Sequence, residues 1–79
     1  MKKEWRITQD GEEYTVTAEY TLLLGSMTVS VNGSTYVLPK KFLTGLFGRK
    51  ESFMLGDKLA ILRIGLFGSA SLTTAGGKY

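Results

Sequence analysis

The chain has 79 residues, no cysteine, no histidine and a formal net charge of +3. A chain this short forms one domain, residues 1–79, and buries only about 60% of its unfolded surface, so each large apolar residue counts. Without cysteine and histidine it lacks thiol nucleophiles, thiolate metal sites, the commonest general base and the commonest transition-metal ligand. We therefore expect no enzyme activity and no catalytic, cofactor-binding or metal-binding residues.

Two tight turns organise the first half of the chain. Asp10-Gly11 and Asn32-Gly33 each separate stretches that alternate apolar and polar residues. Both dipeptides suit a type I′ turn, whose central residues need positive φ, and a two-residue loop also fixes strand register. Ile7 should then face Tyr14 across the first hairpin. The predicted strands are Glu4–Gln9, Glu13–Tyr20, Met27–Val31 and Ser34–Leu38.

The second half continues in the same way after an irregular stretch. Pro39 has no N–H donor and ends the pairing, so residues 39–48 are predicted to be an irregular loop or a short helical turn. Three more strands are expected at Lys50–Leu55, Lys58–Ile64 and Ser69–Thr74, with a hairpin turn at Gly56-Asp57. Lys58–Ile64 is apolar on both faces, which is typical of a central strand covered on both sides. Residues 75–79 are expected to form a loose tail, the alternative being that Tyr79 folds back on the sheet.

Seven short strands at regular spacing predict an all-β fold: a single small antiparallel β-sandwich built from hairpins. The side chains expected inside share one face of each hairpin or belong to the strand covered on both sides. They are Trp5, Ile7, Tyr14, Val16, Val29, Val31, Tyr36, Leu38, Phe53, Leu55, Ile61, Leu62 and Leu72.

The order of these residues resembles the repeat of the Fas apoptotic inhibitory molecule family. In that family a Trp-x-(Val/Ile) opens the unit, an Asp-Gly turn follows, and a later Val-(Asp/Asn)-Gly closes the second hairpin. The matching positions here are Trp5, Asp10-Gly11 and Val31-Asn32-Gly33, with a looser match over Phe53–Gly56 and the terminal Gly77-Lys78-Tyr79.

The resemblance implies a non-enzymatic antiparallel β-sandwich of the interaction type. The chain also departs from the family. It has Thr21-Leu22-Leu23-Leu24 where the family carries a histidine-containing segment. The turn at Gly65–Gly68 is also shorter than the corresponding region of the family. The resemblance implies no particular partner.

One candidate interaction segment combines basic and apolar residues between Pro39 and Lys50. Basic residues beside exposed aromatics bind nucleic acid through phosphates and stacked bases, and the same composition docks on anionic membranes. The alternative is that the apolar residues close the open end of the sandwich while the lysines are solvated. The candidate residues are Lys40, Lys41, Phe42, Leu43, Phe47, Arg49 and Lys50.

A second candidate is the run Leu22, Leu23 and Leu24. Three consecutive side chains cannot all face inward from one strand, because successive residues point to opposite faces. An exposed leucine here would form an interface patch, for example in a homodimer. The alternative is that the segment bends over the sheet and buries two of the three.

These features favour a non-catalytic protein-interaction module that binds another protein or a second copy of itself through apolar loop residues. The alternative is nucleic-acid or anionic-membrane binding through residues 39–50. No small-molecule substrate and no cofactor is evident. Lys2 and Lys3 are not followed by the apolar stretch of a signal peptide, so we expect a cytoplasmic protein if Met1 is the true start.

Overall fold

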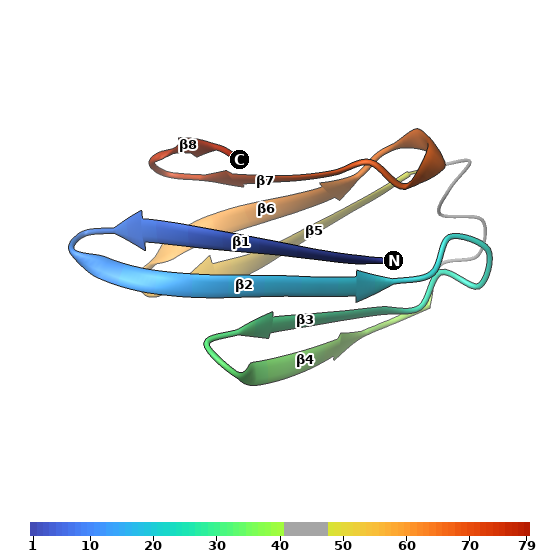
Figure 1. The fold of residues 1–79 in the computed structure, drawn as a ribbon, viewed down its shortest axis with the longest axis horizontal. Helices are drawn as coiled ribbons and strands as arrows, with labels where there is room; N and C mark the ends of the chain where they lie inside the picture. The colour runs from blue at the N-terminus through green and yellow to red at the C-terminus, as the bar shows by residue number, and fades with distance from the viewer. Residues whose placement is uncertain (41–47) are drawn as a thin grey trace.

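The computed structural model describes residues 1–40 and 48–79. Over these ranges the chain forms two antiparallel sheets of four strands each, as Figure 1 shows. Within each sheet, every strand pairs with the strands that precede and follow it in the chain. The first sheet holds β1 (Lys2–Gln9), β2 (Glu12–Tyr20), β3 (Met27–Val31) and β4 (Ser34–Leu38). The second holds β5 (Arg49–Leu55), β6 (Lys58–Ile64), β7 (Ala70–Thr74) and β8 (Gly77–Lys78), with a short 3-10 turn, η1 (Leu66–Gly68), before β7.

The two predicted turns of the first sheet are confirmed. Asp10 and Gly11 have φ of 53° and 78°, and Asn32 and Gly33 have φ of 49° and 86°, as a type I′ turn requires. The register follows from these turns, with Ile7 opposite Tyr14. In the second sheet Gly56 is the first central residue of the turn between β5 and β6. Its φ of 63° fits a type II′ turn, which favours glycine at this position.

The core lies between the inner faces of the two sheets, so the predicted all-β sandwich is confirmed. Strand alternation brings one face of each sheet inward. The buried apolar side chains are Trp5, Ile7, Val16, Ala18, Tyr20, Met27, Val29, Leu55, Ala60, Leu62, Ile64 and Leu72. Tyr14, Val31, Leu38 and Phe53, which were also predicted to lie inside, are only partly buried and pack against this core.

Three sequence expectations about burial and the C-terminal tail were wrong. Tyr36 is 54% exposed because β4 is the edge strand of its sheet. β6 is not covered on both sides: a two-layer sandwich leaves each sheet one solvent face, so Ile61 is only half-buried and Leu59 is 54% exposed. The tail is not loose, because Tyr79 exchanges two backbone hydrogen bonds with Leu72 and extends the sheet with β8.

The two ends of the sandwich differ in character. At one end, on the left of Figure 1, lie the two-residue turns between β1 and β2, β3 and β4, and β5 and β6. We call this the turn end. At the other end lie the longer connections 21–26 and 65–69, which precede β3 and β7. We call this the loop end. The molecule is 37 × 22 × 17 Å, and the strands run roughly along its long axis.

Candidate functional site

Four large apolar side chains project into solvent from the two connections at the loop end. Leu23 and Leu24 are 69% and 52% exposed, and Leu66 and Phe67 are 58% and 84% exposed. Leaving such side chains in water forgoes about 25 cal/mol for each Å² of apolar surface that burial would remove. We call these four residues the apolar loop tips.

Each connection is closed at its base by hydrogen bonds. In the first, the Thr21 amide donates to the Ser26 carbonyl at 3.0 Å, and the Ser26 amide donates to Thr21 Oγ1 at 3.1 Å. In the second, the Gly65 amide donates to the Ser69 carbonyl at 2.7 Å. Because both bases are pinned, the residues between them form short tips that extend beyond the strands.

The two connections also touch one another beneath the tips. Tyr20, the last residue of β2, donates its hydroxyl to the Gly68 carbonyl at 2.8 Å. A Cβ built on Gly68 would lie 3.0 Å from Leu22 Cδ1 and within 2.8 Å of the Met1 side chain, so Leu22 and Met1 pack directly on this glycine. The two pairs of exposed tips therefore stand on one shared base.

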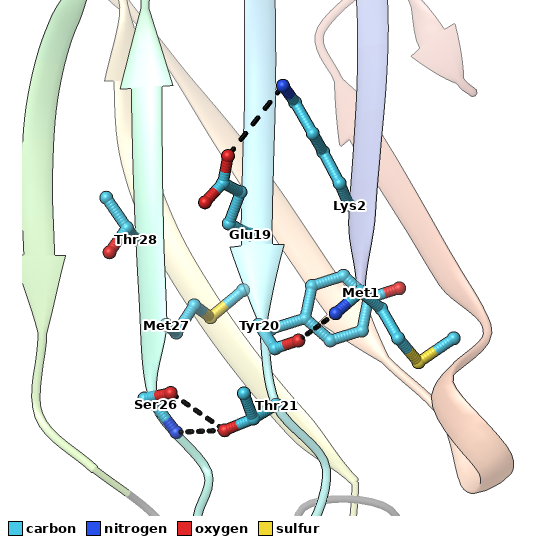
Figure 2. A pocket seen from close by; sticks show the side chains of 8 residues that line it. All are labelled: Met1, Lys2, Glu19, Tyr20, Thr21, Ser26, Met27 and Thr28. Carbon is cyan, nitrogen blue, oxygen red and sulfur yellow. Dashed lines mark hydrogen bonds and ion pairs between the residues drawn. The ribbon is translucent and has the colours of Figure 1, made fainter.

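Figure 2 shows a surface hollow beside this base, lined by residues of β1, β2, β3 and the first connection. The amino group of Met1 donates to the Tyr20 carbonyl, which continues the β1–β2 pairing by one residue. Lys2 lies 3.7 Å from Glu19 across the same two strands. These two pairings hold the start of the chain against the end of β2 beside the hollow. Within the described residues, no group of three or more aspartate, glutamate, histidine or cysteine side chains gathers to hold a metal ion.

A short sequence signal marks both tips, and sequence reasoning missed it. Leu23-Leu24-Gly25 and Leu66-Phe67-Gly68 share the pattern Leu-(Leu/Phe)-Gly, and each is followed by serine and a strand. Both glycines are buried and have positive φ, 72° and 85°. The pattern also occurs at Leu46-Phe47-Gly48, of which the structure describes Gly48, again with positive φ. Such repetition of the tripeptide could have singled out Leu66 and Phe67.

Phe67 has an unfavourable backbone conformation and little compensating burial. Its φ of 59° and ψ of 22° lie in the left-handed region, which costs a non-glycine residue about 1–2 kcal/mol. Its ring is the most exposed of the large apolar side chains in the described residues. A strained residue whose side chain is not packed inside the protein is a candidate for function rather than stability.

The charged side chains are distributed unevenly between the two ends of the sandwich. Apart from the buried pair Arg49–Glu51, the charged residues described at the strand ends next to the loop end are Lys2, Lys3, Lys40, Lys50 and Arg63, with Glu19 as the carboxylate. Those in or beside the two-residue turns are Asp10, Glu12, Glu13 and Asp57, with Lys58 and Lys78 as the cations. Lys50 and Arg63 line one hollow together with Leu66, so positive charge lies next to an apolar tip.

Lys58 ties the two sheets together at the turn end. Its Nζ lies 2.9 Å from Asp10 Oδ2, and its hydrogen bond to this carboxylate raises the pKa of Lys58. Lys58, beside the turn between β5 and β6, is thus held in an ion pair with a carboxylate of the turn between β1 and β2.

The residues of the two predicted interaction segments differ in their exposure in the structure. Leu23, Leu24, Lys40 and Lys50 are exposed, whereas Leu22 is half-buried against Gly68. The remaining predicted residues Lys41, Phe42, Leu43 and Phe47 lie outside the described residues.

Arg49 requires a correction, because it is not an exposed basic residue. Its side chain is 1% exposed and donates to Glu51 Oε1 at 2.8 Å, to the Gly25 carbonyl at 2.8 Å and to the Pro39 carbonyl at 2.6 Å. Arg49 therefore connects the first residue of β5 to the first loop-end connection and to the end of β4. Its role is to hold the loop end in place.

No protein-family model, curated protein or solved structure matches the chain. The resemblance to the Fas apoptotic inhibitory molecule family therefore stays a prediction. No helix among residues 1–40 and 48–79 is long and apolar enough to cross a membrane.

Proposed function

We propose that this protein is a non-catalytic binding module that docks on anionic lipid bilayers through its loop end. The observation that carries the proposal is the coincidence, at one end of the sandwich, of four exposed apolar tips and a group of cations. Leu23, Leu24, Leu66 and Phe67 would enter the boundary between headgroups and acyl chains. Lys40, Lys50 and Arg63 would face the anionic headgroups.

The magnitudes favour a bilayer over attraction by charge alone. Each lysine or arginine close to an anionic membrane contributes about 1 kcal/mol. Full burial of a leucine or phenylalanine side chain contributes about 1.5–3 kcal/mol, and the four tips are between 52% and 84% exposed. The apolar contribution is therefore at least comparable to that of the cations, so binding should require both.

Charge distribution supports the same orientation. The acidic turn end would be repelled by an anionic surface while the loop end is attracted, so the long axis of the molecule would stand away from the membrane. A nucleic acid is a weaker fit to these residues. Binding to single strands relies on aromatic rings on which bases stack, and three of the four tips are leucines.

The test is co-sedimentation with lipid vesicles. We expect binding to phosphatidylcholine vesicles containing about 30% phosphatidylserine, much weaker binding to pure phosphatidylcholine, and a steep fall with added salt. Leu23→Ser combined with Phe67→Ser should lower the partition coefficient more than tenfold, since removing two tips forfeits about 2 kcal/mol or more.

A matched control comes from the outer face of the second sheet. Met54 and Leu59 are each 54% exposed but lie on β5 and β6, next to the turn at the opposite end. Met54→Ser combined with Leu59→Ser should bind vesicles like the wild type. If the control variant loses binding to the same degree, the loop end is not the contact surface. If the wild type binds no anionic vesicle, the membrane proposal is wrong and the protein partner favoured by the sequence takes its place.

A further inference from the structure

The edge strand β4 has a feature that membrane docking does not explain. An edge strand exposes backbone N–H and C=O groups that can pair with another chain, and proteins usually protect such edges with charges, proline or very short strands. β4 (Ser34–Leu38) has five residues and none of them is charged. Four of its five side chains are also exposed, among them Tyr36 at 54% and Val37 at 82%.

The other edges of the two sheets are protected. β1 has Lys2, Glu4 and Arg6 at alternate positions, and β5 carries the exposed Lys50. β8 is two residues long and contains Lys78. Among the edges that the structure describes, β4 therefore stands out as uncharged along its whole length.

The hairpin geometry identifies which backbone groups of β4 have no partner among residues 1–40 and 48–79. The two-residue turn at Asn32-Gly33 makes Val31 and Ser34 a hydrogen-bonded pair. In an antiparallel pair the backbone groups of alternate residues point to opposite sides, so Ser34, Tyr36 and Leu38 direct theirs toward β3. The N–H and C=O groups of Thr35 and Val37 consequently point away from the sheet.

We infer that β4 pairs with β4 of a second copy of this chain in an antiparallel arrangement. A twofold axis beside Tyr36 would place Thr35 of each copy opposite Val37 of the other. Both residues would then exchange N–H···O=C bonds across the axis. The two Tyr36 side chains would lie opposite one another on the same face, at the close spacing of a non-hydrogen-bonded pair. The first sheets of the two copies would merge into one continuous sheet.

The sequence of β4 favours a second copy of this chain as its partner. Pairing about a twofold axis needs a strand that is complementary to itself, and two β4 strands bring no like charges together. The exposed side chains of Tyr36 and Val37 would be partly covered. One five-residue strand falls short of the roughly 1,200 Å² buried in stable interfaces, so the expected dimer is weak and depends on concentration.

The experiment is sedimentation equilibrium over a wide concentration range. We expect the wild type to dimerise with a dissociation constant of about 10–500 μM, in the weak range that a small interface permits. Val37→Pro removes an N–H that points away from β3, so the variant should keep its melting temperature and be monomeric. Val37→Lys places a charge on the edge strand without changing the backbone. It replaces the proline variant in this test if that variant does not fold, and it should also be monomeric.

The matched control places proline at another edge. Met54 occupies the position of β5 next to Leu55, the residue that flanks the two-residue turn, so its N–H also points away from the sheet. Met54→Pro should dimerise like the wild type. A wild type that stays monomeric up to about 1 mM, or a folded Val37→Pro variant that dimerises equally well, would overturn the inference. This result is independent of vesicle binding, which involves the loop end.

Discussion

Arg49 is the buried arginine that joins β5 to the first loop-end connection and to the end of β4. It follows Gly48 and precedes Lys50, so it reads as part of a basic segment. In the structure it begins β5 on the same face as Phe53 and Leu55 and is buried. The predicted strand began at Lys50, so the alternation that makes Phe53 and Leu55 face inward was not extended back to Arg49. The contacts with the Gly25 and Pro39 carbonyls were not predictable, because they depend on how the two sheets meet.

At the residue scale we expect Arg49→Met to be strongly destabilising. The substitution removes the partner of Glu51 and the donor to two carbonyl groups in a buried site. Breaking such a pair from one side costs about 3–5 kcal/mol. Urea denaturation monitored by circular dichroism would measure the free energy of unfolding. Arg63→Met, at an exposed arginine, should change it by less than about 0.5 kcal/mol. Equal effects of the two substitutions would mean that the contacts of Arg49 contribute little.

Hairpins are the elements that the sequence predicted best, because their information is local. A dipeptide such as Asn32-Gly33 specifies a turn type, and the turn type specifies which residues face each other. Strand bounds at Met27–Val31, Ser34–Leu38 and Lys58–Ile64 were predicted correctly. The connections at the loop end were harder. Whether Leu22 is buried and Leu24 exposed depends on Gly68, which is 46 residues beyond Leu22 in the chain.

Between elements, Tyr20 links the end of β2 to the second loop-end connection, and this link gives stability a pH dependence. Burial raises the pKa of the Tyr20 phenol above its ordinary value of 10.0. In the unfolded chain the phenol ionises near pH 10, whereas in the folded protein it keeps its proton to higher pH. The stabilisation is therefore present below about pH 10 and is lost as the pH rises through the folded pKa.

We expect Tyr20→Phe to flatten this alkaline decline and to lower stability at neutral pH by about 1–2 kcal/mol, because the Gly68 carbonyl loses its donor. Thermal melts between pH 7 and about pH 11 would measure both effects. Tyr36→Phe, at an exposed tyrosine of the edge strand, is the control and should leave the decline unchanged. The explanation is wrong if Tyr20→Phe declines as steeply as the wild type.

At the scale of the whole molecule, the placement of charge is more informative than its sum. A net charge of +3 reads as mild attraction to acidic partners. The fold sorts the charges, because the tight turns that carry Asp10, Glu12, Glu13 and Asp57 all lie at one end. The sequence alone does not show that the acidic residues gather at one end of the sandwich, because this depends on how the strands are arranged.

A double charge exchange tests whether the placement of the charges or the net charge governs membrane docking. Lys50→Glu combined with Glu13→Lys leaves the net charge at +3 but removes a cation from the loop end and a carboxylate from the turn end. If placement governs docking, this variant should bind anionic vesicles several-fold more weakly than the wild type, as expected for about 1 kcal/mol per charge near the surface. Vesicle co-sedimentation at low salt would measure the difference. Unchanged binding would mean that only the overall charge matters.

The order of the strands has a consequence for how the chain reaches its native state. Each strand pairs only with its neighbours in the chain, so both sheets can assemble from consecutive hairpins at a small loss of loop entropy. The step that joins distant parts is the meeting of the two layers, which buries Leu55, Leu62 and Leu72 against Ile7 and Val16. Folding should accordingly be fast for an all-β protein, since speed depends on how far apart in sequence the contacting residues lie.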